Sequence, residues 1–128
     1  MGVEDKIMAK INNLLQQAKA NSYFRQVLET GKHTQVVIMS IPPGGEIGEE
    51  VHPDNDQVLY LVDGAGQVVL EGQTADFNVG DLVLVPSGTK HNFISKDDAA
   101  MKIITTYSPP HHPDGTVHKT KAEADAAD

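Results

Sequence analysis

The spacing of hydrophobic positions changes twice along the chain. Near the N-terminus, apolar residues recur at intervals of three and four, which is the period of an amphipathic helix. They are Ile7, Ile11, Leu14, Leu15 and Ala18. Glu4 and Asp5 come first, where a helix dipole favours negative charge. The pattern predicts one helix over residues 3–20, whose apolar stripe packs on the rest of the domain or on a second subunit.

From Ser22 to Tyr107 the pattern becomes that of short strands. Runs rich in Val, Ile and Tyr are separated by Gly, Pro, Asn and Asp at intervals of about 8–12 residues. The predicted strands are Tyr23–Thr30, Thr34–Ile41, Val58–Val62, Gln67–Glu71, Leu82–Val85, His91–Ile94 and Met101–Tyr107. Many short strands without long helices between them predict an all-β antiparallel sandwich or barrel rather than a βαβ fold.

The C-terminal part, residues 108–128, differs again. It opens with Ser-Pro-Pro-His-His-Pro-Asp-Gly, in which the prolines prevent a regular strand or helix. Thr120-Lys121-Ala122-Glu123 has the order of a capping box before a short alanine-rich helix. We therefore expect one domain, with an N-terminal helix over residues 1–21, a barrel over 22–107 and a C-terminal extension over 108–128.

Charge and composition exclude several classes of function. The net charge is −8, with 18 acidic and 10 basic residues, which opposes binding to nucleic acid or an anionic membrane. No apolar run approaches the ~20 residues that span a bilayer, and the first residues lack the pattern of a secretory signal, so we expect a cytoplasmic protein. The chain has no Cys, so any metal would rely on His, carboxylate or amide ligands.

Two segments carry residues that suit a metal site. Glu50 and His52 are two residues apart, so in an extended strand both face the same side and Glu49 faces the other. Gln57 begins the next apolar run, and His91 begins a later strand after a Pro-Ser-Gly turn. If all four faced one interior, two imidazoles, one carboxylate and one amide would suit Fe(II), Mn(II), Ni(II), Co(II) or Zn(II).

The same segments resemble the two sequence motifs of the cupin superfamily over roughly residues 34–107. In the first motif, Glu50-Val51-His52 stands in place of His-X-His and Gln57 in place of Glu. The flanking glycines of this motif are Gly44 or Gly45 and Gly64. The second motif matches in register at Gly80, Pro86, Gly88 and His91, with Ser95 where Asn is usual.

The resemblance implies a jelly-roll barrel that holds one divalent metal ion through Glu50, His52, Gln57 and His91. One carboxylate is gained at position 50 and one is lost at position 57, so the ligand set keeps a net charge of −1. A neutral amide is a weaker donor than imidazole, so we expect weaker metal retention than in a three-His site. A degenerate pocket without metal is the alternative.

Strand alternation predicts which residues line the pocket. Leu59 and Leu61 share the face of Gln57, while Phe93 and Ser95 share the face of His91. Met39 and Tyr107 complete the predicted pocket, although alternation does not anchor Met39, and Tyr107 lies near the barrel end. A small, mostly apolar pocket with a polar floor suits a compact organic ligand that chelates the metal.

The remaining histidines fall outside the motifs. His33 lies in a predicted hairpin turn and is expected at the surface. His111, His112 and His118 lie in the extension, which we expect to pack on the barrel or on a partner with its imidazoles facing solvent. The alternative is that these histidines cap the barrel mouth or bind a second metal.

The resemblance implies dioxygenases, isomerases, decarboxylases and lyases as the range of activities. We expect a metal-dependent enzyme, of oxygenase or isomerase type, that acts on a small organic molecule. The alternative is a non-catalytic module that binds a metal or metabolite. Sequence reasoning identifies no general base, although His112 or Tyr107 would be near enough if the extension folds back. A homodimer is expected, as is common among cupins.

Overall fold

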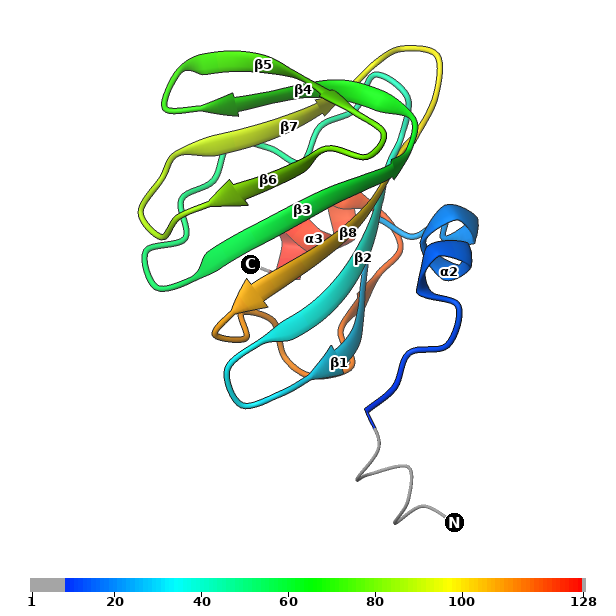
Figure 1. Ribbon diagram of the computed structural model, residues 1–128, viewed down its shortest axis with the longest axis vertical. Coiled ribbons are helices and arrows are strands. Elements are labelled where there is room, and N and C mark those ends of the chain that lie inside the picture. Colours follow the sequence, from blue (N-terminus) through cyan, green and yellow to red (C-terminus); the bar gives the residue numbers. More distant parts are fainter. Residues whose placement is uncertain (1–8, 128) are drawn as a thin grey trace.

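The computed structural model describes residues 9–127 and has two antiparallel sheets that face each other (Figure 1). One sheet has six strands in the order β6-β3-β8-β2-β1-β9, and the other has three in the order β5-β4-β7. The strands are β1 (Arg25–Thr30), β2 (Gln35–Ile41), β3 (Asp56–Asp63), β4 (Ala65–Leu70), β5 (Gln73–Asn78), β6 (Leu82–Val85), β7 (His91–Ser95), β8 (Met101–Ser108) and β9 (Val117–His118). The helices are α2 (Leu14–Ala20) and α3 (Lys121–Ala127). The predicted all-β jelly-roll barrel is confirmed.

The interior of the barrel has a polar end and an apolar end. Side chains alternate strictly along the central strand β8, where every second residue is buried. At one end of the large sheet, Tyr107 lies opposite Gln57 on β3 and Gln35 on β2, and all three are buried. Towards the other end, the rows across β3, β8 and β2 become apolar, as in Leu61–Ile103–Met39. A site with polar chemistry therefore belongs at the first end.

Helix α2 covers part of the outer face of the large sheet. Ala18 is buried against Ile38 and Val62, which point away from the barrel interior. The prediction of one continuous helix over residues 3–20 is wrong, because residues 9–11 are not helical and residues 12 and 13 form a turn, while residues 3–8 lie outside the described part. Asn13 is in the left-handed conformation at φ 52°, which asparagine tolerates better than most residues. Because this conformation is not helical, α2 begins only at Leu14.

The N-terminal half of the predicted apolar stripe is thus not part of a single helix. Ile11 precedes α2, and Leu15 within α2 is 52% exposed, so only Leu14 and Ala18 of the described positions pack on the sheet. Ile7 lies outside the described residues. Neither α2 nor α3, in the part of the chain that the structure describes, is long and apolar enough to cross a bilayer.

The predicted strands are all present, with ends shifted by one to a few residues, but two strands had no prediction. β5 reads Gln-Thr-Ala-Asp-Phe-Asn and only Phe77 is buried, because β5 is an edge strand facing solvent. β9 has two residues and exists only because the extension returns to pair with β1. Neither strand carries the apolar alternation that would identify it in the sequence.

The extension ends in a capped helix that closes the barrel. Thr120 Oγ1 accepts a hydrogen bond from Glu123 N at 3.1 Å, as the predicted capping box requires. Glu123 Oε1 accepts from Lys119 N at 2.9 Å, one residue before the position usual for that motif. Ala124 of α3 is 2% exposed and belongs to the barrel core. The extension therefore contributes to the folded core.

Gly66 is the position where the sheet holding His91 is most sensitive to added volume. A Cβ atom there would collide with the carbonyl oxygen of Ile94 on β7 and lie 2.6 Å from Met101 Sδ. We expect Gly66→Ala to reduce the free energy of unfolding by about 2 kcal/mol or more, because a packed core accommodates extra volume only by strain. Gly31→Ala is the control, since its nearest contact would be Thr34 O at 3.3 Å. Equal urea midpoints for the two variants would contradict this.

Candidate metal centre

Backbone pairing places Glu50 directly beside His91. The segment from Glu46 to Glu50 runs antiparallel to β7, with isolated bridges that join Glu46 to Ile94 and Glu50 to His91. Glu50 N donates to His91 O and His91 N donates to Glu50 O, each at 2.9 Å. Directly opposed residues of an antiparallel pair project to the same face, so the carboxylate and the imidazole become neighbours.

His52 reaches the same point from two residues further on. The loop that carries it is held by Gly88 N, which donates to His52 O at 2.9 Å, and by Ser87 N, which donates to Asp56 Oδ1 at 2.8 Å. The rings of His52 and His91 lie 5.2 Å apart between centroids. The motif loops around residues 52–56 and 86–88 therefore bind each other and hold the two imidazoles at a fixed separation.

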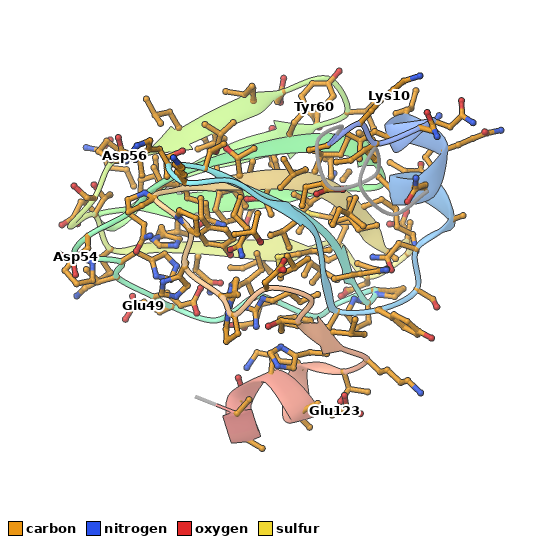
Figure 2. All side chains as sticks on the ribbon, turned by 90° about the horizontal axis from the view of Figure 1, so that it is seen from below. Lys10, Glu49, Asp54, Asp56, Tyr60 and Glu123 are labelled. Carbon is orange, nitrogen blue, oxygen red and sulfur yellow. The ribbon has the colours of Figure 1, made fainter. Side chains whose placement is uncertain are left out.

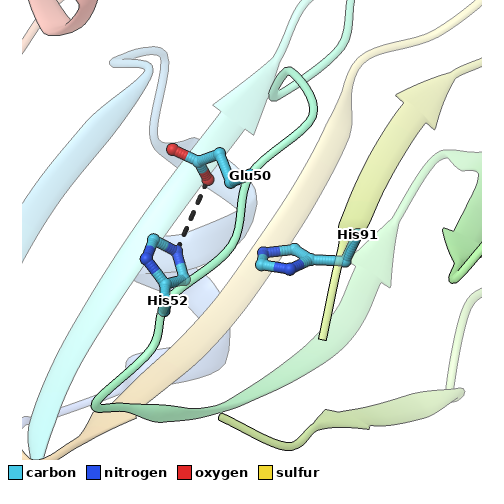
Figure 3. A group of neighbouring side chains, drawn as sticks. All are labelled: Glu50, His52 and His91. Atoms are coloured by element: carbon cyan, nitrogen blue, oxygen red, sulfur yellow. Dashed lines mark ion pairs between the residues drawn. The ribbon is translucent and has the colours of Figure 1, made fainter. Parts of the chain in front are cut away.

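Glu50, His52 and His91 converge on one point, as Figure 3 shows. One ligand atom from each residue can be chosen so that all three lie within 4.8 Å of one another. His91 is 1% exposed and His52 7%, while the side chain of Glu50 is 29% exposed. Glu49 is exposed and lies at the periphery of the molecule (Figure 2), as the alternation predicted. In residues 9–127 this is the one group of three or more His, Asp or Glu that has such spacing.

The imidazole of His91 has the hydrogen-bonding state that a metal ligand needs. His91 Nδ1 lies 2.9 Å from the carbonyl oxygen of Thr89, which can only accept, so Nδ1 carries the proton and Nε2 carries a lone pair. His91 Nε2 is buried and has no hydrogen-bond partner among the described residues, and the same holds for His52 Nε2. Leaving buried polar atoms unpaired is costly, and a cation at this point would satisfy both nitrogens.

Gln57, at the polar end of the barrel, also has a buried polar atom without a hydrogen-bond partner among the described residues. It is 2% exposed, and its Nε2 donates to Thr105 Oγ1 at 3.1 Å. Its Oε1 is buried without a partner in the described part of the chain. The residue opposite Gln57 on β8 is Tyr107, whose ring lies 5.8 Å from that of His52, so the amide belongs to the same region. An unpaired amide oxygen is a suitable fourth ligand for a divalent ion.

Electrostatics keep the carboxylate and one imidazole in their metal-binding states. Burial tends to raise the pKa of Glu50, but its interactions with His52, Arg25 and His91 outweigh burial and lower it below the usual value. His52 Nε2 lies 3.6 Å from Glu50 Oε1, an ion-pair distance and too long for a hydrogen bond. Burial lowers the pKa of His91 below its usual value. Glu50 is therefore ionised and His91 neutral near neutral pH.

The predicted pocket residues are all buried but do not all reach this site. They are Met39, Leu59, Leu61, Phe93, Ser95 and Tyr107. Tyr107 lies at the polar end, and Phe93 contacts His91 with ring centroids 6.3 Å apart. Leu61 and Met39 belong to a row near the apolar end of the barrel. Ser95 is about 13 Å along β7 from His91, and its hydroxyl donates to Ala99 O at 2.9 Å.

The extension packs on the barrel, as expected, and also covers its mouth. His111 faces solvent, whereas the imidazole of His112 is half-buried. Gln35 binds it from inside the barrel: Nε2 donates to His112 O at 2.8 Å, and Oε1 accepts from the backbone nitrogens of His111 and His112. The ring of His111 lies 4.4 Å from that of His52 and is stacked on Tyr107 at 5.4 Å. His33 is exposed, as expected. In the sequence, the pair of histidines between prolines is the one signal that these residues lie at the barrel mouth.

Comparisons with known proteins agree with the fold. The sequence model of the family described as a cupin domain matches residues 37–107, which include all four predicted ligands. The uncharacterized protein YrkC of Bacillus subtilis (strain 168) is 44% identical over 123 residues, covering 91% of this chain and 66% of YrkC. The chain thus spans about two thirds of the length of that relative.

A solved structure and a characterised enzyme are also similar. The crystal structure of BH2720 from Bacillus halodurans has a TM-score of 0.89 at 38% identity and covers 91% of this chain and 93% of that one. The acireductone dioxygenase of Rhodopseudomonas palustris (strain TIE-1) is 45% identical over 42 residues, which are 30% of this chain and 26% of that enzyme. The first similarity extends over nearly the whole fold, whereas the second is confined to a short stretch.

The half-buried imidazole of His112 makes the stability of the fold depend on pH. Burial, with the charges of Arg25, His111, His118 and His52, lowers its pKa to about 3. The unfolded chain takes up this proton near the ordinary value of 6.5 and the folded chain does not, so His112 destabilises the fold progressively as pH falls from 6.5 towards 3. We expect His112→Gln to have a shallower loss of stability over this range, measured as urea midpoints at several pH values. The exposed His33→Gln is the control, and parallel curves for wild type and His112→Gln would refute the assignment.

Proposed function

Because this chain belongs to the cupin domain family, we propose that it is a metal-dependent enzyme that acts on a small organic molecule at the polar end of its barrel. One observation carries the proposal. His52 Nε2, His91 Nε2 and Gln57 Oε1 are buried atoms without hydrogen-bond partners among the described residues, and they accompany the ionised carboxylate of Glu50. A divalent cation would satisfy all of them.

Each proposed ligand has a supporting contact. Thr89 O orients the imidazole of His91, and Thr105 Oγ1 orients the amide of Gln57. The bridge to His91 fixes the backbone of Glu50, and Gly88 N holds the backbone of His52. These outer contacts hold the donors in place before a metal arrives, which raises affinity. With four protein ligands, a six-coordinate ion keeps two positions for a substrate. A bound divalent ion would supply Lewis-acid polarisation of an oxygen atom of the substrate.

The residues around the ligands control access and solvent. Leu59 and Phe93 are fully buried and continue the interior away from the polar end, so one side of the site is apolar. On the other side, the buried Tyr107 and the exposed His111 of the extension both contact the ring of His52. A substrate enclosed between them would be shielded from bulk water, where electrostatic interactions are stronger.

The oxygenase branch has more support than the isomerase branch. Two imidazoles and one carboxylate are the ligand combination of many non-haem Fe(II) oxygenases, and Gln57 adds a neutral donor. The short stretch similar to an acireductone dioxygenase points the same way. We therefore propose Fe(II) as the first metal to test, with Mn(II), Ni(II), Co(II) and Zn(II) as alternatives.

The second candidate is a module that binds a metal or metabolite without converting it. In residues 9–127 no Asp, Glu or Lys is buried, and Glu50 is committed to the metal site. An enzyme that moves protons needs another group for this task, and His111 or His112 would have to supply it from the extension. If they do not, a binding role follows.

The sequence predicts a homodimer and a cytoplasmic location, and we propose both for this protein. Support for the dimer comes from Tyr60, Leu82 and Leu84, which are exposed on β3 and the edge strand β6. Tyr60 and Leu82 are directly opposed partners, so the apolar side chains form a continuous surface. The molar mass in solution, measured by light scattering, tests this proposal.

Removing the proposed ligands should remove the metal. We expect His52→Ala and His91→Ala to weaken metal binding by more than about 100-fold, since even the outer partners of ligands contribute about 10–100-fold. Gln57→Leu should cause a smaller loss, because a neutral amide is the weakest donor of the set. Metal content of purified, metal-loaded protein measures this, with His33→Ala as a control for a histidine in solvent. Undiminished metal in both ligand variants would eliminate the site.

Turnover separates the two candidate functions. We expect Fe(II)-loaded protein to consume oxygen with at least one member of a panel of catechols, diketones and thiols, and His91→Ala to abolish this consumption. Oxygen uptake in a closed electrode cell is the measurement, with Fe(II) alone as the blank. Tight binding of a panel member without oxygen consumption would favour the binding module.

A further inference from the structure

Arg25 is a buried charge that the proposed metal site does not use. It is 3% exposed on β1, opposite Met39 of β2, and so lies on the inner face of the large sheet. Its Nη1 lies 3.1 Å from His118 Nδ1, and its guanidinium carbon lies 5.3 Å from the ring centroid of Phe24. Its Nε is buried and has no hydrogen-bond partner among the described residues.

No carboxylate within residues 9–127 lies at ion-pair distance from this guanidinium. The ion pairs there join His52 to Glu50 and Lys121 to Asp125, and neither includes Arg25. An arginine has five N–H donors and stays charged, so one imidazole and one aromatic ring leave it poorly compensated. A buried charge without a counter-ion destabilises a fold. Burial of Arg25 therefore reduces the stability of the fold, unless a ligand binds to the guanidinium.

The charge of Arg25 acts on groups of the metal site and of the extension. Its charge contributes to lowering the pKa values of both Glu50 and His112, which places it within electrostatic reach of both. His112 in turn contacts Tyr107, with ring centroids 5.0 Å apart, and Tyr107 lies beside His52. The backbone of Arg25 lies in the row of Met39, and its long side chain brings the guanidinium within electrostatic reach of Glu50 and His112.

The charge of the whole site calls for an anion. A divalent ion on Glu50 and neutral ligands leaves one net positive charge, and Arg25 adds a second. No other acid is buried in the described part of the chain to balance them. A carboxylate matches the planar fork of arginine with two parallel hydrogen bonds, which a neutral group cannot do.

We propose that Arg25 binds the carboxylate of a small organic acid, while a second oxygen of the same molecule occupies an open position on the metal. The proposal deepens the proposed function and rests on it, because it names the class of molecule that the site takes. His118 and Phe24 position the guanidinium through the hydrogen bond and the stacking contact. Arg25, Phe24 and His118 all lie outside residues 37–107, so this specificity belongs to the ends of the chain and not to the matched family region.

The test compares acids with neutral analogues. Titration calorimetry of Mn(II)-loaded protein would use oxalate, pyruvate and lactate beside oxamide, pyruvamide and lactamide. We expect at least one acid to bind at least about tenfold more tightly than its amide, because the amide cannot pair with the fork. Arg25→Met should abolish this preference and weaken binding of the acid by at least about tenfold. Lys119→Met, which removes one exposed positive charge, is the matched control and should bind as wild type does.

Stability and metal content distinguish binding from a structural role. If Arg25 serves a ligand, Arg25→Met should retain Mn(II) and melt at the wild-type temperature or above, because it removes an uncompensated charge. Arg25→Lys keeps the charge without the fork and should show an intermediate preference, which preserves the test if Arg25→Met does not fold. Unchanged acid binding in Arg25→Met, or no acid preference in wild type, would overturn the proposal.

Failure of the metal site would show separately, as wild-type protein that retains no Mn(II). In that case the same acids are tested on metal-free protein by their effect on melting temperature. Stabilisation of the wild type by an acid and not by its amide, absent in Arg25→Met, would still assign the carboxylate site to Arg25. Equal effects on both proteins would overturn it.

Discussion

The site depends on one pair of backbone hydrogen bonds, the reciprocal bonds between Glu50 and His91. They join a segment that is otherwise a connection to the edge of the smaller sheet. Because the two residues are directly opposed, Glu50 and His91 share a face, and His52 follows from the two-residue period. Three side chains from positions 50, 52 and 91 thus converge without any long flexible side chain having to find its partner.

The barrel around this pair divides its interior into two environments. Rows of apolar residues such as Leu61, Ile103 and Met39 supply the hydrophobic stabilisation away from the site. That allows the other end to hold buried polar atoms without hydrogen-bond partners among the described residues, on His52, His91 and Gln57. Such atoms cost stability, and their concentration in one place is the physical mark of a ligand site.

Much of the fold was predictable because strand periodicity is a local property. β2, β6, β7 and β8 appear close to where their apolar runs predicted them. The prediction failed where solvent or long-range pairing decides the structure. β5 has polar residues because it is an exposed edge strand, and β9 exists only through its pairing with β1. The helical periodicity near the N-terminus did not produce one continuous helix, because Asn13 is left-handed.

The sequence by itself determined that Glu50 and His52 share a face, that Glu49 does not, and that His91 opens a strand after a turn, since each follows from alternation or turn chemistry over a few residues. Only the tertiary structure decided that the extension covers the mouth and that Arg25 contacts the extension. Arg25 meets His118 across 93 positions, and Gln35 meets His112 across 77. Contacts at such separations depend on the closure of the whole sheet, which no local pattern encodes.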